Sequence, residues 1–183
     1  KSYLTISTTE KEIGDFLSYI LSSSEIRVKI SNDVVGTELS AILKNVYALI
    51  TGVCHGLGYG DNFLAVLITA STNELKRVLL ALDNKERSIF QPAYLGDLLV
   101  TCYSIHSRNR RFGTYIGKGY SVDATKSAMN MVAEGYNATH CIYELLSNES
   151  YNTESPIISA AYNILYKEID PKEEIERLSN VIS

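Results

Sequence analysis

Side chains that could bind an anion are concentrated between Tyr94 and Gly113, in a sequence that is otherwise apolar and rich in helical patterns. The segment holds one acid, Asp97, and a compact polar cluster. The cluster consists of Ser107, Arg108, Asn109, Arg110 and Arg111. Three guanidinium groups within five residues suit several simultaneous charge-assisted hydrogen bonds to phosphate oxygens. The segment therefore favours an anion-binding site, although a basic run is also typical of a solvated turn.

Lys44 is a second candidate for a functional residue, because it lies on the opposite face of its helix from the apolar side chains. Apolar residues recur at helical spacing along a helix that we expect to begin near Asp33 and to end within residues 56–60. At about 100° per residue, Lys44 lies opposite that stripe, with the small residues Ala41 and Ala48 one turn to either side. A ligand or a second helix could approach its amino group, but the periodicity alone favours a solvated lysine.

The sequence predicts neither a metal site nor a disulfide framework. Its three cysteines are odd in number and widely spaced, and they form no CxxC motif. The three histidines stand singly, which is more typical of structural residues than of ligands. The glycines of GLGYGDN at residues 56–62 lack the GxGxxG spacing and follow no strand, so they do not form a dinucleotide loop.

The composition is that of a folded soluble chain with a modest negative charge. Apolar residues make up 45% and charged residues 21%, and no run approaches the roughly 20 apolar residues that a membrane span needs. A net charge of −4 disfavours nucleic acid as a partner and favours a small anionic ligand. The unpaired cysteines and the strand-like first residues predict a reducing cytoplasm. Because the chain begins with Lys1, we expect further residues upstream.

Strand-like alternation predicts one β-α-β unit in residues 1–31. Residues 3–7 and 26–30 alternate as strands, and a capping box of Thr8 or Thr9 with Glu12 opens the helix between them. The apolar stripe of that helix consists of Ile13, Phe16, Leu17, Ile20 and Leu21. A single unit of this kind cannot make a stable parallel sheet. We therefore interpret residues 1–31 as the end of a truncated α/β domain.

The remaining sequence, residues 32–183, has helical periodicity almost throughout and predicts an all-α domain. One helix is expected over residues 62–82 and another after Glu134. Pro156 and Pro171 should each stand in the first turn of a further helix, where proline is well tolerated. The predicted fold class is mainly α, with a helical domain that follows the single β-α-β unit.

Six motifs stand in order along the chain. They are Asp33-Val-Val-Gly-Thr-Glu-Leu39, Ala41-Ile-Leu-Lys44-Asn45-Val46, Gly56-Leu-Gly-Tyr-Gly-Asp-Asn62, Leu95-Gly-Asp97-Leu-Leu-Val-Thr101-Cys102, Ser107-Arg-Asn-Arg-Arg-Phe-Gly113 and Val132-Ala-Glu134-Gly135. Together they resemble the family of NAD(P)-dependent glycerol-3-phosphate dehydrogenases over nearly the whole chain. The resemblance implies an all-α substrate-binding domain, like the C-terminal domain of 6-phosphogluconate dehydrogenase. It also implies that residues 1–31 end an NAD-binding Rossmann domain.

The activity that the resemblance implies is that of an oxidoreductase. Such an enzyme interconverts dihydroxyacetone phosphate and sn-glycerol 3-phosphate by hydride transfer with NAD or NADP, and it supplies glycerol phosphate for phospholipid synthesis. The family's dinucleotide loop and a second active-site lysine would lie upstream of this sequence, so we expect the chain alone to be inactive. The resemblance implies a small-molecule substrate and a cytoplasmic enzyme. The choice between NAD and NADP stays open. Whether the enzyme is a homodimer also stays open.

The resemblance also implies roles for individual residues, matched motif by motif. Lys44 resembles the family's proton acceptor, and Asp97 is expected to orient groups beside it by hydrogen bonding. The implied substrate contacts are Lys44, Asp97, Ser107, Arg108 and Asn109. The implied nucleotide contacts are Arg108, Val132 and Glu134, and two further polar residues that match the site are Asn45 and Thr101. Tyr94 stands where the family more often has small residues. It could narrow the pocket beside Asp97, but it leaves the matched polar residues unchanged.

Other functions stay open at the level of sequence. A related hydroxy-acid dehydrogenase would use a helical domain of the same kind, because fold alone does not select a substrate. A binding module that kept the phosphate site without catalysis would fit a naturally short chain. A nucleic-acid binder that uses the arginines would need more basic surface and stacking aromatic side chains.

Overall fold

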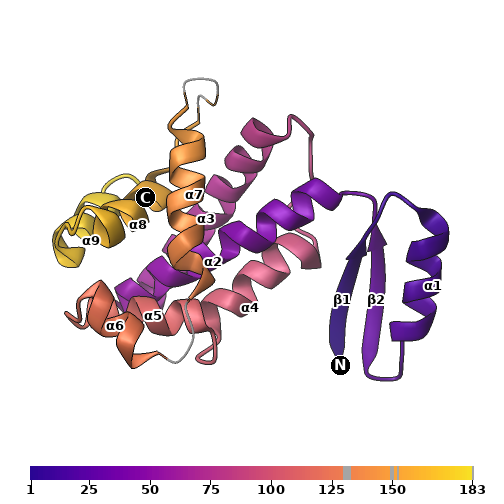
Figure 1. Cartoon of the computed structure of the whole chain (residues 1–183), viewed down its shortest axis with the longest axis horizontal. Helices are drawn as coiled ribbons and strands as arrows, with labels where there is room; N and C mark the ends of the chain where they lie inside the picture. Colours follow the sequence, from indigo (N-terminus) through magenta and orange to yellow (C-terminus); the bar gives the residue numbers. More distant parts are fainter. Residues whose placement is uncertain (130–132, 149–150, 152, 183) are drawn as a thin grey trace.

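The chain folds into a bundle of helices with a two-stranded parallel sheet at one end (Figure 1). The computed structural model describes residues 1–129, 133–148, 151 and 153–182. The first elements are β1 (Ser2–Ser7), α1 (Lys11–Leu21) and β2 (Ile26–Ser31). The bundle consists of α2 (Val34–Gly56), α3 (Asp61–Leu82), the π-helical turn η1 (Pro92–Gly96), α4 (Asp97–Tyr103), α5 (Arg108–Gly117), α6 (Val122–Ala128), α7 (Glu134–Leu146), α8 (Pro156–Tyr166) and α9 (Pro171–Ser179). The predicted fold class, mainly α, is confirmed.

Helix α2 lies at the centre of the bundle and begins and ends where its sequence predicts. The side chain of Asp33 accepts a hydrogen bond from the backbone N–H of Gly36 (3.3 Å) and so caps the first turn. Within residues 43–54, only Lys44 is not buried. By length and apolar composition α2 could cross a membrane, but 56% of its most apolar window is buried inside the molecule. Its neighbours on all sides identify α2 as the core helix of this bundle (Figure 1).

Helix α5 packs against α2 at unusually short range, because Gly113 has no side chain. A Cβ atom at this position would lie 1.9 Å from the carbonyl oxygen of Leu49, which no real Cβ does. The two backbones are therefore in direct contact. Phe112 and Ile116 flank the contact and are buried in the core. This packing fixes the middle of α5 against the middle of α2.

The β-α-β unit forms as predicted, but its capping differs. β1 and β2 pair in parallel, with Ser2 opposite Ile26 and Ser7 opposite Ser31. The prediction of a capping box at α1 is wrong, because Glu10 is the N-cap residue and its side chain makes no cap bond. The oxygen of Thr8 instead accepts from the backbone N–H of Glu10 (3.1 Å). Much of the apolar stripe of α1 is exposed, because a sheet of two strands cannot cover it.

Asp33 also joins α2 to the segment that leads into α4. Arg87 donates from Nε to Asp33 Oδ2 (2.6 Å), and the hydroxyl of Tyr94 donates to the same oxygen (2.5 Å). These bonds, that of Arg87 first, hold the pKa of Asp33 well below its usual value against the opposing effect of burial. Tyr94 is 4% exposed. The expectation that it narrows a pocket beside Asp97 is therefore wrong, because its side chain is buried against Asp33.

Glu74 connects α3 to α8 in the interior. Its fully buried carboxylate accepts hydrogen bonds from the backbone N–H groups of Ile157 (2.8 Å) and Ile158 (3.1 Å) in the first turn of α8. The N-cap residue of α8, Ser155, makes no side-chain cap bond. Glu74 thus supplies the missing cap from another helix. Burial raises the pKa of Glu74 to about 7, although the two backbone bonds favour its charged form.

Candidate functional site

Lys44 and Asp97 form a close ion pair between α2 and α4. Lys44 Nζ donates to Asp97 Oδ2 at 2.5 Å. Asp97 is the first residue of α4 and follows the turn η1, whose first residue is Pro92. The side chain of Lys44 is 22% exposed and that of Asp97 is 39% exposed. A small molecule can therefore reach both groups from solvent, while most of the lysine side chain is held by the protein.

A chain of amides extends from the residue after Lys44 to α5 and α7. Asn45 Oδ1 accepts from Asn109 Nδ2 (2.8 Å), and Asn109 Oδ1 accepts from the backbone N–H of Gly135 (2.8 Å). Asn45 Nδ2 donates to Glu134 Oε2 (3.3 Å). Both asparagines are buried. The chain explains how residues from three helices keep a fixed position beside Lys44.

Gly135 lets the first turn of α7 approach this amide chain. A Cβ atom at residue 135 would lie 2.6 Å from the carbonyl oxygen of Asn45 and 3.0 Å from Asn109 Oδ1. Any larger residue would push α7 away from α2 and break the bond from its backbone N–H to Asn109. The motif Glu134-Gly135 therefore has a packing role that the sequence pattern did not reveal.

The N-terminal end of α5 presents polar and charged groups on the same side of the molecule. Ser107 is its N-cap residue, and its side-chain oxygen accepts from the backbone N–H of Arg110 (3.3 Å). Arg108 Nη2 lies 3.6 Å from Glu134 Oε1, and both side chains are substantially exposed. The end of a helix at which N–H groups point outward, together with a guanidinium, favours an anion. The basic run thus begins a helix and is not a solvated turn.

The structure brings together most of the residues that the sequence singles out. We name as the Lys44 site the residues Lys44, Asn45, Asp97, Ser107, Arg108, Asn109 and Glu134. Val132 lies outside the described residues. The hydroxyl of Thr101 donates a hydrogen bond to the backbone oxygen of Asp97 (2.7 Å), and Thr101 thereby stabilises the start of α4. No sequence pattern relates Asp33 to Arg87, or Glu74 to the first turn of α8, because these partners are distant in sequence.

Two buried cysteines near the bundle core do not offer nucleophilic chemistry. Burial raises the pKa of Cys54 to about 12 and that of Cys102 to about 12. Both therefore remain thiols at neutral pH, and the thiolate is the reactive form. Within the described residues, no group of three or more His, Cys, Asp and Glu side chains is arranged to hold a metal ion. The chemistry of the Lys44 site rests on a lysine, a carboxylate, amides and a guanidinium.

Comparison with known protein families decides the identity of the domain. Residues 33–176 match the family described as NAD-dependent glycerol-3-phosphate dehydrogenase C-terminus. The chain belongs to this family. The match covers α2 through most of α9 and includes every residue of the Lys44 site. The family resemblance of the sequence motifs is thereby confirmed.

Curated relatives of this glycerol-3-phosphate dehydrogenase domain carry the same family name. The glycerol-3-phosphate dehydrogenase (NAD(P)+) of Halothermothrix orenii is 37% identical over 175 residues, which are 96% of this chain and 51% of the relative. That of Clostridium acetobutylicum is 36% identical over 175 residues, 96% of this chain and 52% of the relative. The chain thus spans about half the length of the curated relatives it matches.

Solved structures of glycerol-3-phosphate dehydrogenases have the same fold. The enzyme of Coxiella burnetii superposes with a TM-score of 0.89 at 30% identity, and the match covers 95% of this chain and 53% of that one. The protein of Dunaliella salina superposes with a TM-score of 0.84 at 20% identity, over 94% of this chain and 31% of that one. At 20% identity the second likeness concerns the fold alone.

Proposed function

We propose that this chain is the substrate-binding half of an NAD(P)-dependent glycerol-3-phosphate dehydrogenase. The reaction interconverts dihydroxyacetone phosphate and sn-glycerol 3-phosphate. The observation that carries the proposal is the 2.5 Å contact of Lys44 with Asp97, beside an anion-favouring helix end, in a chain of this family. A site for a phosphorylated alcohol substrate needs a group that transfers a proton and a group that binds the phosphate.

Lys44 is the proposed acid and base. When the glycerol hydroxyl is oxidised, a neutral Lys44 amine takes the hydroxyl proton, and in the reverse direction the ammonium returns that proton to the ketone oxygen. The cofactor, when bound, accepts or delivers the hydride. Asp97 accepts one N–H of the lysine and so orients its amino group. The two further hydrogens of a lysine ammonium can point toward the substrate oxygen.

The N-terminal end of α5 is the proposed phosphate site. Arg108 can form a planar two-point contact with phosphate oxygens, which a lysine cannot reproduce. Ser107 caps the helix and Asn109 fixes it to Asn45, so the guanidinium starts from a rigid base. The substrate would lie between Arg108 and Lys44, with its phosphate toward the helix end.

Two exposed residues are part of the proposed edge of a dinucleotide site. Arg108 and Glu134 are exposed and lie 3.6 Å apart, where they would contact the nicotinamide dinucleotide together with Val132. We propose that residues 1–31 end the dinucleotide-binding domain and that residues 32–183 form the substrate-binding domain. The uncovered apolar surface of α1 supports this division, because it would pack against the rest of such a domain. Either NAD or NADP suits this proposal.

The same proposal sets the cellular context. Such an enzyme would act in the cytoplasm, on a small-molecule substrate, and would supply glycerol phosphate for phospholipid synthesis. A homodimer is the assembly that we propose. Nucleic acid is not a proposed partner, because the chain carries a net charge of −4.

The decisive experiment is Lys44→Met in the complete protein that contains this chain. Methionine keeps the length and helix propensity of lysine and removes the titrating amine. Oxidation of NADH or NADPH with dihydroxyacetone phosphate is measured in a spectrophotometer. A general acid or base contributes roughly 10² to 10⁴-fold in rate, and we expect kcat to fall by at least that range.

The matched control is Lys76→Met, at an exposed lysine on α3. Its kcat should stay within about twofold of the wild type, because surface substitutions usually have small effects. Circular dichroism should show both variants folded. Near-normal kcat in a folded Lys44→Met variant would remove Lys44 from the mechanism, and absence of turnover in the wild-type protein would remove the proposed reaction.

A further inference from the structure

Tyr94 connects the ion pair of Lys44 and Asp97 to the N-cap of α2. Its hydroxyl donates to Asp33 Oδ2 (2.5 Å), and its backbone oxygen accepts from the backbone N–H of Asp97. Asp97 in turn accepts from Lys44, which lies on α2 eleven positions after Asp33. About three helical turns separate these two residues of α2. The contacts therefore form a closed loop that leaves α2 at its cap and returns to it at Lys44.

The carboxylate that accepts from Tyr94 has a fixed orientation. Arg87 donates from Nε to Asp33 Oδ2 (2.6 Å) and from Nη2 to Oδ1 (3.1 Å), a two-point contact that holds both oxygens. Nη1 of the same arginine donates to the backbone oxygens of Asp83 (3.3 Å) and Lys85 (3.0 Å), just after α3. The bond from Arg87 is the main reason why the pKa of Asp33 is well below its usual value. Asp33 is therefore a charged and immobile acceptor at neutral pH.

The segment from Tyr94 to Asp97 is short and internally hydrogen-bonded. It belongs to the π-helical turn η1, in which the N–H of Asp97 also donates to the backbone oxygen of Pro92. The N–H groups of Tyr94 (3.0 Å) and Gly96 (3.4 Å) both donate to the backbone oxygen of Gln91. Such turns are frequent at functional sites. A displacement of the Tyr94 ring would therefore move the backbone of Asp97 with it.

The side chain of Asp97 depends on this backbone for its position. Among the described residues, Lys44 is the only one that donates a hydrogen bond to its carboxylate, and the carboxylate is 39% exposed. An ion pair that solvent reaches holds its own geometry weakly, because ordering two side chains costs entropy. The contact of Lys44 with Asp97 therefore needs a rigid backbone at the start of α4.

We propose that Tyr94 is a positioning residue for the ion pair of Lys44 and Asp97. Its hydrogen bond to Asp33 fixes the start of α4, so that Asp97 holds one N–H of the lysine and leaves the other two directed toward the substrate oxygen. Tyr94 is buried and does not contact the substrate itself. The catalytic consequence rests on the proposed dehydrogenase reaction, whereas the effect on the ion pair does not.

The first test is Tyr94→Phe in the complete protein that contains this chain. Phenylalanine keeps the buried ring and removes only the hydroxyl. We expect kcat with dihydroxyacetone phosphate to fall about threefold to thirtyfold, less than the roughly hundredfold cost of a misplacement of about 1 Å. KM should stay within about twofold of the wild type, because the proposed phosphate contact of Arg108 is unchanged. An unchanged kcat would contradict the positioning role.

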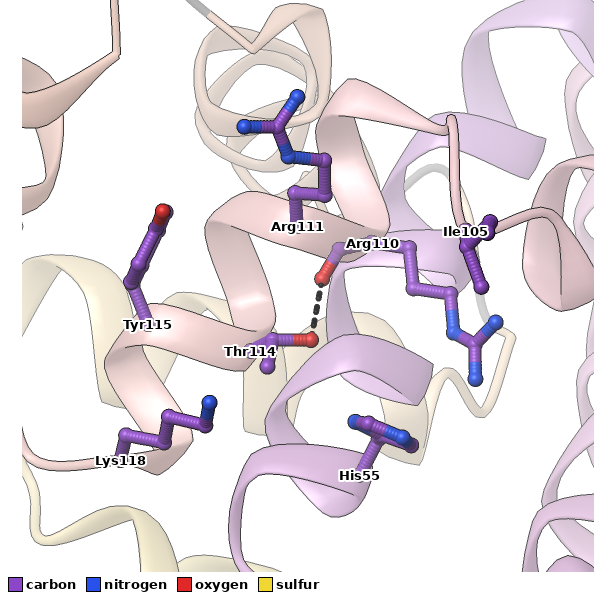
Figure 2. Close-up of a pocket in the computed structure, with 7 residues that line it drawn as sticks. All are labelled: His55, Ile105, Arg110, Arg111, Thr114, Tyr115 and Lys118. Atoms are coloured by element: carbon purple, nitrogen blue, oxygen red, sulfur yellow. Dashed lines mark hydrogen bonds between the residues drawn. The ribbon is translucent and has the colours of Figure 1, made fainter.

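The matched control is Tyr115→Phe, which makes the same change on α5. Tyr115 lines a pocket between α2 and α5, and Figure 2 shows its hydroxyl turned away from the other labelled side chains. Its edge contact with the ring of Tyr120 survives the substitution. We expect kcat to stay within about twofold of the wild type. An equal fall of kcat in both variants would argue against a specific role of Tyr94.

A double-mutant cycle with Asp97→Ala separates positioning from a general loss of stability. A residue that acts through Asp97 has no further effect once that carboxylate is gone, whereas independent effects multiply. In the Asp97→Ala background, Tyr94→Phe should therefore change kcat less than about twofold. The same fall of kcat in both backgrounds would show that Tyr94 acts on the fold as a whole, and the proposal would be wrong.

A measurement without turnover tests the ion pair directly. The NMR signal of the ε-methylene group of Lys44 is assigned by its absence from the spectrum of Lys44→Met. We expect Tyr94→Phe to shift this signal and Tyr115→Phe to leave it in place. If the wild-type protein does not reduce dihydroxyacetone phosphate, the proposed reaction fails, and the NMR signal still decides the role of Tyr94. A signal that Tyr94→Phe leaves unchanged would overturn the inference.

Discussion

The hydroxyl of Tyr94 donates a 2.5 Å hydrogen bond to Oδ2 of Asp33, across 61 positions of sequence. It thereby connects the cap of α2, which carries Lys44, with η1, which leads into Asp97. Burial and the neighbouring Asp33 carboxylate raise the pKa of Tyr94 to about 12, so the phenol stays protonated and remains a donor. The two helices that carry the ion pair are therefore joined by a second, buried contact.

Tyr94→Phe should lower the free energy of unfolding by about 1.5 to 3 kcal/mol, the contribution of a hydrogen bond to a charged group. Asp33 keeps its bonds to Arg87 and Gly36, so the fold should survive. Denaturant unfolding measures the change. Tyr19→Phe is the control, because Tyr19 is 85% exposed and should change stability by less than about 0.5 kcal/mol. Equal effects would show that the buried bond adds no stability.

Arg108→Lys in the complete protein should lower kcat/KM for dihydroxyacetone phosphate about tenfold to a hundredfold. Lysine keeps the charge but loses the planar two-point contact, and a charged hydrogen bond contributes about 1.5 to 3 kcal/mol. Steady-state kinetics at several phosphate-substrate concentrations provide the measurement. Arg27→Lys makes the same change at an exposed strand position and should leave kcat/KM unchanged. An unaltered Arg108→Lys enzyme would exclude the guanidinium from substrate binding.

Glu74 should make stability fall as the pH rises from about 4.5 to 7. Its pKa is raised from the ordinary value of 4.5 to about 7 by burial, so in this range the folded state holds more protons than the unfolded state. The stabilisation is fully present below pH 4.5 and is lost as the pH passes through 7. A rise of this size corresponds to about 3 kcal/mol across the window.

Glu74→Gln removes this titration, so the variant should lose that slope when the free energy of unfolding is measured between pH 4.5 and 7.5. Glu176→Gln, at an exposed position on α9, should keep the wild-type slope. If the wild type and Glu74→Gln have parallel pH profiles, Glu74 does not change its protonation on unfolding in this range.

Gly113→Ala should destabilise the bundle by about 1 to 3 kcal/mol or more, because the new Cβ would overlap the carbonyl oxygen of Leu49. Gly60→Ala is the control, since nothing lies within 4 Å of a Cβ at that position. Its unfolding free energy should change by about 1 kcal/mol or less. Similar melting temperatures for the two variants would contradict a direct backbone contact between α2 and α5.

Features that depend on neighbouring residues were predictable from the sequence. The N-cap of α2 at Asp33, the parallel pair of short strands and the helices that begin at Pro156 and Pro171 all follow from local patterns. The N-cap of α1 was predicted wrongly. Thr8 and Thr9 are both favoured N-cap residues, but the N-cap residue is Glu10, one position after Thr9.

Features that depend on distant partners were not predictable. Glu74 lies on α3, and the sequence pattern of that helix does not indicate that its carboxylate is buried. Its partners at the start of α8 are more than 80 positions away. The bond between Asn45 and Asn109 likewise joins two helices that no single-sequence pattern relates. The motifs identified the residues of the Lys44 site through the family resemblance, and their catalytic roles stay predictions.

The contact of Gly113 with Leu49 limits how this domain can change its substrate preference. Side chains between two helices normally act as adjustable spacers, and evolution can widen or narrow a site by changing their size. Here backbone touches backbone, so the spacing of α2 and α5 at this contact is not set by a side chain whose size could change. A longer substrate would need a shorter side chain at an exposed position of the Lys44 site, such as Glu134. A shorter substrate could not be bound more tightly by moving α2 and α5 closer together, because their backbones are already in contact.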